Sequence, residues 1–200
     1  MKTAGRKASI NSQDIIDAAI NLVGPHRSIS SLSLREVTRE AGIAPNSFYR
    51  HFKDMDELNI AIIDLAGRHL RSIIRDARAL IINERSVVRV SVECFFNEMN
   101  KEGSSLPILL REGTVGSGDF QAAIKKQLDF FAKELQTDLD KANSIKQRYK
   151  PEETLVVAKA VTQLVFAMGG IALNSHEKDL KKTVEETVLM VKFILKGAAS

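Results

Sequence analysis

The sequence has few of the residues that form disulfides or anchor a protein at a membrane. Its 200 residues include one cysteine, no tryptophan, two tyrosines and four prolines. A single cysteine cannot form an internal disulfide. No apolar run approaches the length needed to span a membrane, and the N-terminus is polar and basic without a hydrophobic signal region. We therefore expect a cytoplasmic protein that makes no membrane contact.

Signs of catalysis are equally scarce. The four histidines are scattered, with no cysteine or carboxylate at metal-ligand spacing, and there is no glycine-rich phosphate loop and no serine elbow. Cys94 stands beside Val92, Phe95 and Phe96. These neighbours favour a small buried hydrophobe over a redox sensor, because a reactive thiolate needs exposure and positive charge nearby. We expect no enzyme, no metal site and no cofactor.

What the sequence does contain is helical periodicity. Hydrophobic residues make up 44% of the chain and charged residues 27%, which is enough for one sizeable core and a small second one. There is no alternating strand-like run of useful length, no repeat and no low-complexity tract. The predicted fold class is all-α. Beyond residue 83 the pattern predicts helices over residues 86–100, 106–113, 119–146, 151–173 and 177–197.

The segment SLSLREVTREAGIAPNSFYRHFKDMDEL, residues 31–58, predicts a helix-turn-helix. Ser33 and Glu36 have the spacing of a capping box, which starts a helix at the next residue. Gly42 ends that helix, because glycine readily adopts the left-handed conformation of a helix terminus. Pro45 fits the first turn of a second helix, which we expect to run to about Phe52. Two short helices joined by a glycine turn are the arrangement that places the second helix in the DNA major groove.

The second of these helices has few apolar residues that could be buried in a core. Phe48 and Phe52 form its only apolar stripe, and the remaining side chains are polar. Asn and Arg can pair with base edges, while Ser, Tyr, His and Lys can bond phosphate oxygens. The alternative is a merely solvated polar face. The predicted DNA-binding residues are Ser33, Arg35, Ala44, Pro45, Asn46, Ser47, Tyr49, Arg50, His51 and Lys53.

The charge distribution supports this reading. Residues 1–53 hold eight Lys and Arg against four Asp and Glu, whereas the rest of the chain holds 21 of each sign. The whole surplus of +4 therefore lies in the segment expected to meet a polyanion, although a solubilising basic end would look the same. A helix capped by Asn11 or Ser12 and stopped by Gly24-Pro25 would complete a three-helix head. Arg6 and Lys7 precede it in an arm that either reaches DNA or is a non-contacting tail.

These residues resemble a known family. The order GIAPNSFYRHFKDMDEL, with its Phe48-Tyr49-Arg50-His51-Phe52 core, is similar to the DNA-binding domain of the TetR family of bacterial transcription repressors. The resemblance implies an N-terminal helix-turn-helix domain, residues 1–53. It also implies a C-terminal helical bundle for effector binding and dimerisation, residues 54–200.

The predicted body begins with a long helix over residues 54–83, roughly 45 Å at about 1.5 Å per residue, which can connect the head to a distant core. Its arginines at positions 68, 71, 75 and 78 are interpreted as a solvated face. The helix over residues 151–173 is apolar at nearly every angle, so it must be covered on more than one side. Burial within one subunit is one cover, and a second copy is the other. The predicted dimer residues are Val161, Val165, Gly169, Val184, Val188 and Val191.

A two-fold dimer would set two heads on successive major-groove faces and so predicts a palindromic operator. Aromatic and thioether side chains in the body could either fill the core or line a cavity. The TetR resemblance implies an effector pocket there, and the scarcity of inward polar clusters favours a long lipophilic ligand. The predicted pocket residues are Phe95, Phe96, Met99, Leu110, Arg111, Phe120, Ile124, Phe131 and Met168.

A narrower resemblance refines the ligand. Besides the head, Pro107-Ile108-Leu109-Leu110-Arg111-Glu112-Gly113 and Phe120-Gln121-Ala122-Ala123 are similar to the branch that represses unsaturated fatty-acid biosynthesis and senses acyl thioesters, acyl-CoA or acyl-ACP. In that light Arg111 would steady the thioester or phosphopantetheine group. The alternative for Arg111 is an ion pair at a helix end.

The resulting hypothesis is a repressor in which an acyl ligand favours one spacing of the two heads, and only one spacing matches the operator. The alternatives are a TetR-type regulator of another lipophilic response such as efflux, a lipid-binding module with a vestigial head, and a constitutive DNA-bending protein with a solid core.

Overall fold

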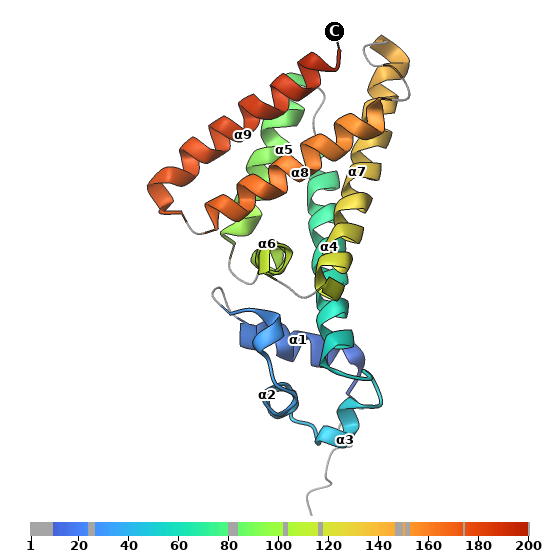
Figure 1. The fold of residues 1–200 in the computed structure, drawn as a ribbon, viewed down its shortest axis with the longest axis vertical. Coiled ribbons are helices and arrows are strands. Elements are labelled where there is room, and N and C mark those ends of the chain that lie inside the picture. The colour runs from blue at the N-terminus through green and yellow to red at the C-terminus, as the bar shows by residue number, and fades with distance from the viewer. Residues whose placement is uncertain are drawn as a thin grey trace, which may run out of the picture. The chain divides into compact units, whose positions relative to one another are not determined.

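The structure, a computed structural model, describes residues 10–23, 27–79, 84–101, 104–115, 118–146, 150, 153–173 and 175–199. Every regular element in these ranges is helical, which confirms the predicted all-α class (Figure 1). The chain divides into two compact units, residues 1–62 and 63–200. The first unit extends nine residues past the predicted domain boundary, because it includes the first two turns of the long helix α4 (Met55–Ala79).

The first unit, the head, is built from four short elements and the start of α4. They are α1 (Ser12–Val23), the 3-10 turn η1 (Ile29–Ser31), α2 (Leu34–Glu40) and α3 (Pro45–Phe48) (Figure 1). Asn11 caps α1, because its Oδ1 accepts from the Asp14 backbone N–H at 3.0 Å. The residues that form the small core are fully buried: Ile15, Ala19, Ile29, Val37, Phe48, Leu58 and Ile62. The predicted arm, Arg6 and Lys7, and the Gly24-Pro25 stop lie outside the described residues.

The turn η1 was not expected from the helical pattern. The Ser28 side chain accepts from the Ser30 backbone N–H at 3.1 Å, and Ile29 is completely buried. A serine side chain that bonds the backbone two residues on favours a turn, because it replaces a main-chain partner. The turn leads the chain from α1 to the cap of α2.

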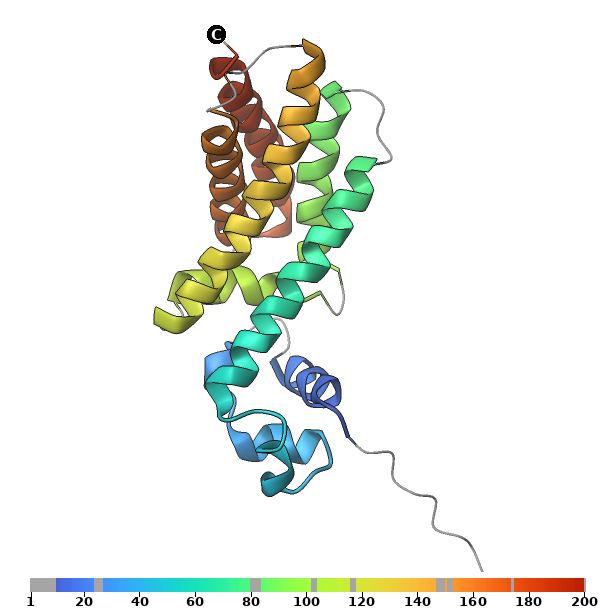
Figure 2. The same ribbon diagram turned by 90° about the vertical axis from the view of Figure 1, so that its right-hand side faces the viewer.

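The second unit, the body, holds the rest of α4 and five further helices. These are α5 (Glu84–Met99), α6 (Leu106–Val115), α7 (Gly118–Lys146), α8 (Thr154–Ala172) and α9 (Glu177–Gly197). Helix α8 packs against both α7 and α9, α9 also packs against α5, and α6 packs against α7 and α8 (Figure 2). The start of α9 and the ends of α7 and α9 coincide with the predicted bounds, and α6 is two residues longer.

Aromatic rings fill the centre of the body. Phe95 contacts Phe96 and Phe166 with both pairs of ring centroids 5.4 Å apart, and Phe131 contacts Phe166 at 5.3 Å. Gly169 of α8 lies against the Phe95 ring so closely that a Cβ there would come within 2.7 Å of a ring carbon. The glycine therefore gives the ring room inside the subunit.

The expectation that no apolar stretch approaches membrane-spanning length is wrong for helix α8. Its span of 19 residues and mean hydropathy of 1.8 would be enough to cross a membrane by length and composition alone. It is the one helix among the described residues with these properties. The composition has a packing explanation, because Val157, Ala158, Val161 and Met168 are buried within the body and α8 has neighbours on two sides.

Candidate nucleic-acid interface

The start of α2 is held by the predicted capping box. Ser33 Oγ accepts from the Glu36 backbone N–H at 3.3 Å, and the Ser33 N–H donates to Glu36 Oε2 at 3.0 Å. Arg27 adds an ion pair to the same carboxylate at 3.1 Å. Hydrogen bonds from Arg27, and then those from Ser33, lower the pKa of Glu36 from 4.5 to about 2. The prediction of the cap is confirmed, and Arg27 is a partner that sequence spacing alone does not reveal.

The turn between α2 and α3 needs its glycine. Gly42 has a φ of 66°, in the left-handed region that side chains with a Cβ avoid. The Ile43 N–H donates to the Thr38 carbonyl at 2.9 Å and closes the end of α2. Pro45 then occupies the first turn of α3, where its missing N–H is no loss. These local preferences together set the angle at which α3 leaves α2.

Helix α3 is shorter than predicted. It ends at Phe48, and Tyr49 is its C-cap with φ −67° and ψ −6°. The chain continues as a tight turn in which the Arg50 N–H donates to Ser47 and the His51 N–H donates to Phe48. The prediction of a regular helix to residue 52 is therefore wrong. The turn keeps a helical hand, so the polar side chains still share one side.

Two phenylalanines attach this segment to the head. Phe48 is fully buried and Phe52 nearly so, with ring centroids 5.7 Å apart. Tyr49 is 56% exposed, and its ring meets the edge of Phe48 at 5.6 Å. The anchored pair holds the opposite side of the segment toward solvent. The exposed members of the predicted DNA-binding set are Arg35 on α2 and, in this segment, Ala44, Pro45, Asn46, Tyr49, Arg50 and Lys53.

Three of the predicted DNA-binding residues are less available. Ser33 is exposed, but its hydroxyl is engaged in the cap of α2. Ser47 and His51 are half-buried, and His51 Nδ1 lies 3.4 Å from the Ser12 hydroxyl at the start of α1. The contact brings Ser12 to the edge of the exposed face, and no sequence signal indicates it. For all ten residues, DNA contact stays a prediction.

Comparison with known proteins identifies the head. Residues 15–62 match the model of the bacterial regulatory proteins of the tetR family. This segment is therefore similar to the DNA-binding domain of that family. The match covers α2, the glycine turn and α3, the elements that the geometry had already singled out.

Solved structures extend the likeness to the TetR fold as a whole. The fatty acid degradation regulator FadR from Bacillus halodurans aligns with a TM-score of 0.71 at 16% identity, over 95% of this chain and 96% of its own. A transcriptional regulator from Rhodococcus sp. Rha1 gives 0.73 at 15%, over 96% and 99%. The reduced form of NemR from E. coli gives 0.68 at 17%, over 92% and 96%. At these identities the likeness shows a common fold, a TetR-type head followed by a helical body.

The residues predicted for an effector pocket are mostly buried in the TetR-type body. Eight of the nine are buried, and Arg111 is half-buried. Phe95 and Phe131 both contact the ring of Phe166, which is not among the predicted pocket residues, and Phe96 contacts Phe95. Whether these side chains line a ligand site stays a prediction.

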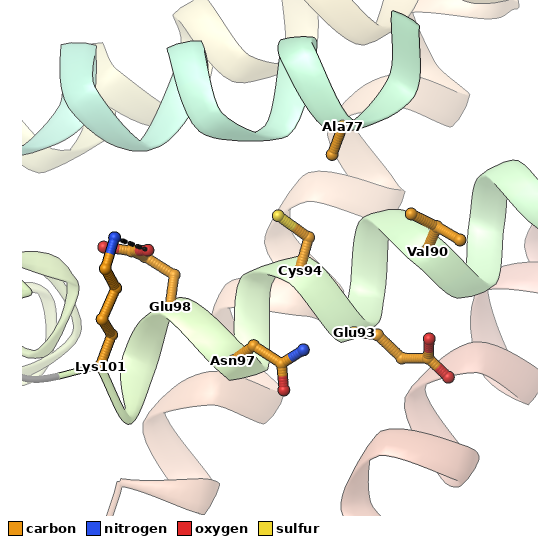
Figure 3. Close-up of a pocket in the computed structure, with 7 residues that line it drawn as sticks. All are labelled: Ala77, Val90, Glu93, Cys94, Asn97, Glu98 and Lys101. Carbon is orange, nitrogen blue, oxygen red and sulfur yellow. Dashed lines mark ion pairs between the residues drawn. The ribbon is translucent and has the colours of Figure 1, made fainter. Parts of the chain in front are cut away.

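A hollow of about 400 Å³ opens elsewhere in the body, between α4 and α5 (Figure 3). None of the predicted pocket residues lines it. The half-buried Cys94 thiol points toward α4 there, and burial, followed by the charge of Glu98, raises its pKa. The lining residues are Ala77, Val90, Glu93, Cys94, Asn97, Glu98 and Lys101.

The predicted dimer residues lie mostly inside the subunit. Val161, Gly169, Val188 and Val191 are buried there. Helices α8 and α9 pack against each other, α8 also against α7, and α9 also against α5. Contact of these residues with a second copy stays a prediction. Val165 and Val184 are half-buried. The exposed apolar side chains on the two helices are Val156, Ile171, Leu189, Met190 and Phe193, from 39% to 66% exposed.

The arginine row of α4 also differs from its interpretation as a solvated face. Arg68 and Arg75 are exposed, but Arg71 is only 9% exposed and the Arg78 side chain 12%. Arg71 and Arg78 each form an ion pair with a carboxylate of α7. The i, i+7 spacing of Asp64, Arg71 and Arg78 was the signal for this second, inward face.

Proposed function

We propose that the chain is a dimeric repressor of TetR type whose two heads bind a palindromic operator under the control of a lipophilic effector. The proposal depends on one observation above all. The buried pair Phe48 and Phe52 holds Asn46, Tyr49 and Arg50 on the exposed side of a head that matches the TetR DNA-binding domain. Those side chains can reach base edges and phosphates of duplex DNA.

The head is tested by substitution in the recognition segment. An operator is first selected from a pool of random duplexes, and its affinity is then measured by gel shift. Arg50→Ala should weaken specific binding by about 5-fold to 150-fold, since a bidentate arginine contributes about 1–3 kcal/mol of base discrimination. Tyr49→Ala should also weaken binding. Arg75→Ala removes the same charge from an exposed site in the body and serves as the control; equal effects of the two arginine variants would refute the assignment.

The second copy is assigned to the exposed apolar face of α8 and α9 that contains Ile171, Leu189 and Phe193. Isolated exposed hydrophobics are ordinary, but five large ones lie on two helices that pack against each other, and association would remove such side chains from water. Phe193→Glu places a charge in that patch and should yield a monomer in sedimentation. Lys133→Glu on α7 introduces the same side chain elsewhere. An unchanged dimer in Phe193→Glu would refute this face.

For the effector we propose an acyl thioester and, as the regulated process, fatty-acid biosynthesis. Two features of the body support this ligand. The aromatic cluster of Phe95, Phe131 and Phe166 is suited to an acyl chain, and the half-buried Arg111 could bind an anionic head group. The fold is shared with the fatty acid degradation regulator FadR from Bacillus halodurans, at an identity that supports the fold alone. The protein would act in the cytoplasm.

Titration of acyl-CoA of several chain lengths into the protein–operator complex tests the effector. A change in operator affinity that depends on chain length supports the proposal. A lipid-binding module predicts lipid retained on purification without salt-dependent DNA binding. A constitutive DNA-bending protein predicts DNA binding that no acyl-CoA alters, and an efflux-type regulator predicts a response to other lipophilic compounds only.

A further inference from the structure

The start of α2 is held by a guanidinium that comes from outside the helix. Arg27 Nη1 pairs with Glu36 Oε1 at 3.1 Å, and Arg27 Nη2 donates to Glu36 Oε2 at 3.1 Å. The same side chain bonds the end of η1, because its Nε donates to Ser31 Oγ and its Nη2 to the Ser31 carbonyl, both at 2.9 Å. Only arginine offers a planar fork of this kind. We call Arg27, Ser31 and Glu36 the arginine clamp.

Glu36 carries a negative charge at neutral pH. Hydrogen bonds from Arg27 and Ser33 lower its pKa to about 2, and its side chain is 32% exposed. The charge is not hidden in a core, so it would act on any polyanion that approaches the start of α2. Arg27 supplies the matching positive charge at ion-pair distance. The clamp therefore makes this end of α2 neutral where Glu36 alone would make it acidic.

The exposed arginines of α2 would be the next partners of Glu36 if Arg27 were absent. Arg39 follows Glu36 by three residues, a spacing at which oppositely charged side chains on a helix meet. Arg35 and Arg39 are exposed, and neither forms an ion pair within the part of the chain that the structure describes. Because the clamp occupies the Glu36 carboxylate, Arg35 and Arg39 keep their charges for another partner.

Helix α2 has the place in the motif that meets the phosphate backbone. In a helix-turn-helix the first helix crosses the backbone of the duplex while the second enters the major groove. Here α2 is the first helix and α3 is the second. Each positive side chain that meets a phosphate releases a bound counterion and so adds salt-dependent affinity. An uncompensated carboxylate on α2 would repel the phosphates and remove part of this affinity.

We propose that Arg27 is a positioning residue for DNA binding, which neutralises Glu36 and leaves Arg35 and Arg39 to meet phosphates. The inference rests on the proposed function and adds to it a residue outside the ten predicted contacts. It also explains how an acidic capping residue is compatible with a basic head. A capping box needs a carboxylate or an amide at the position of Glu36, and Arg27 cancels the charge that the carboxylate brings.

The test measures the affinity of the full chain for DNA at several salt concentrations by fluorescence anisotropy. Two duplexes are used, the selected operator and a duplex of random sequence. Arg27→Gln should weaken binding by up to about 10-fold at about 0.1 M salt and reduce the slope of log affinity against log salt by about 1, since one fewer counterion is released. Adding Glu36→Gln should restore both values, because glutamine keeps the capping box without the charge.

Two controls separate the charge of the clamp from its packing. Glu40 is an exposed acid on α2 outside the clamp, so Glu40→Gln added to Arg27→Gln should restore affinity less than Glu36→Gln does. Arg27→Lys keeps the charge without the planar fork, so it should bind nearly as tightly as the parent chain. A clamp that only held the fold would instead give weak binding with the parent's salt slope in every variant that breaks it.

The role of Arg27 is overturned if the double variant Arg27→Gln/Glu36→Gln binds no better than Arg27→Gln, if Glu40→Gln gives an equal recovery, if Arg27→Lys binds as weakly as Arg27→Gln, or if the salt slope stays at the parent value. Should Arg27→Gln not fold by circular dichroism, Glu36→Gln alone decides, since it should bind at least as tightly as the parent and weaker binding overturns the role.

The random duplex judges Arg27 even when no operator is selected, because the salt-dependent part of the affinity is independent of sequence. Failure to select an operator would overturn the proposed function alone. A parent chain that binds no duplex at all would overturn both.

Discussion

Two adjacent glycines on α8 allow a sharp test of which side of that helix faces the core. Gly169 is buried, and a Cβ there would lie 2.7 and 2.9 Å from two carbons of the Phe95 ring and 3.1 Å from a Leu110 methyl. At Gly170 a Cβ would meet nothing within 4 Å. The two positions have the same helical backbone, so Gly169→Ala and Gly170→Ala differ only in what the added methyl meets.

The magnitudes follow from two opposing effects. Alanine stabilises a helix interior by about 1 kcal/mol relative to glycine, and both variants gain this. Overpacking a filled core costs about 1–3 kcal/mol, and only Gly169→Ala incurs it, because Phe95 is held by Phe96 and Phe166. Gly170→Ala should therefore be stabilised by up to about 1 kcal/mol. The difference between the two variants should be about 1–3 kcal/mol, since the helix propensity cancels.

The free energy of unfolding is measured by urea denaturation with far-UV circular dichroism, at several protein concentrations because association would contribute to stability. For a chain of this length the expected difference corresponds to roughly 2–12 °C in melting temperature. Equal stability of the two variants, or a less stable Gly170→Ala, would show that α8 presents its other side to the core. The dimer face proposed on α8 and α9 would then be wrong as well.

Three smaller predictions concern the head and the single thiol. The pKa of Glu36 is lower in the folded chain than its ordinary 4.5, so its contribution to stability is present above pH 4.5 and is lost as the pH falls toward 2. Glu36→Gln should therefore flatten that part of a curve of unfolding free energy against pH. An unchanged curve would contradict the pairing of Glu36 with Arg27. Ser33→Ala should cost about 1 kcal/mol in urea unfolding by removing the cap of α2, and a cost near zero would show that the cap is dispensable. Cys94 should react with iodoacetamide more slowly than a free thiol at pH 7, because burial and Glu98 raise its pKa, and a fast reaction would contradict the half-buried geometry.

The sequence by itself determined the elements that depend on local chemistry. The capping box of Ser33 and Glu36, the left-handed Gly42 and the position of Pro45 each follow from what a short peptide prefers, and the structure contains all three. Helix bounds in the body could be predicted for the same reason, since the apolar period is local. The family of the head could also be recognised, because its residues lie in one continuous stretch.

Which side of a helix meets which neighbour was decided only by the tertiary structure. Helix α8 is apolar all round, so its period could not tell that Gly169 faces Phe95 while Ile171 faces outward. Helix α4 is charged on several sides, so composition could not tell buried Arg71 from exposed Arg75. In both cases the residues that decide the orientation are distant in the sequence. Gly169 faces the core because only glycine fits beside the Phe95 ring, and Arg71 is buried because a carboxylate of α7 pairs with it. A local sequence pattern contains neither piece of information.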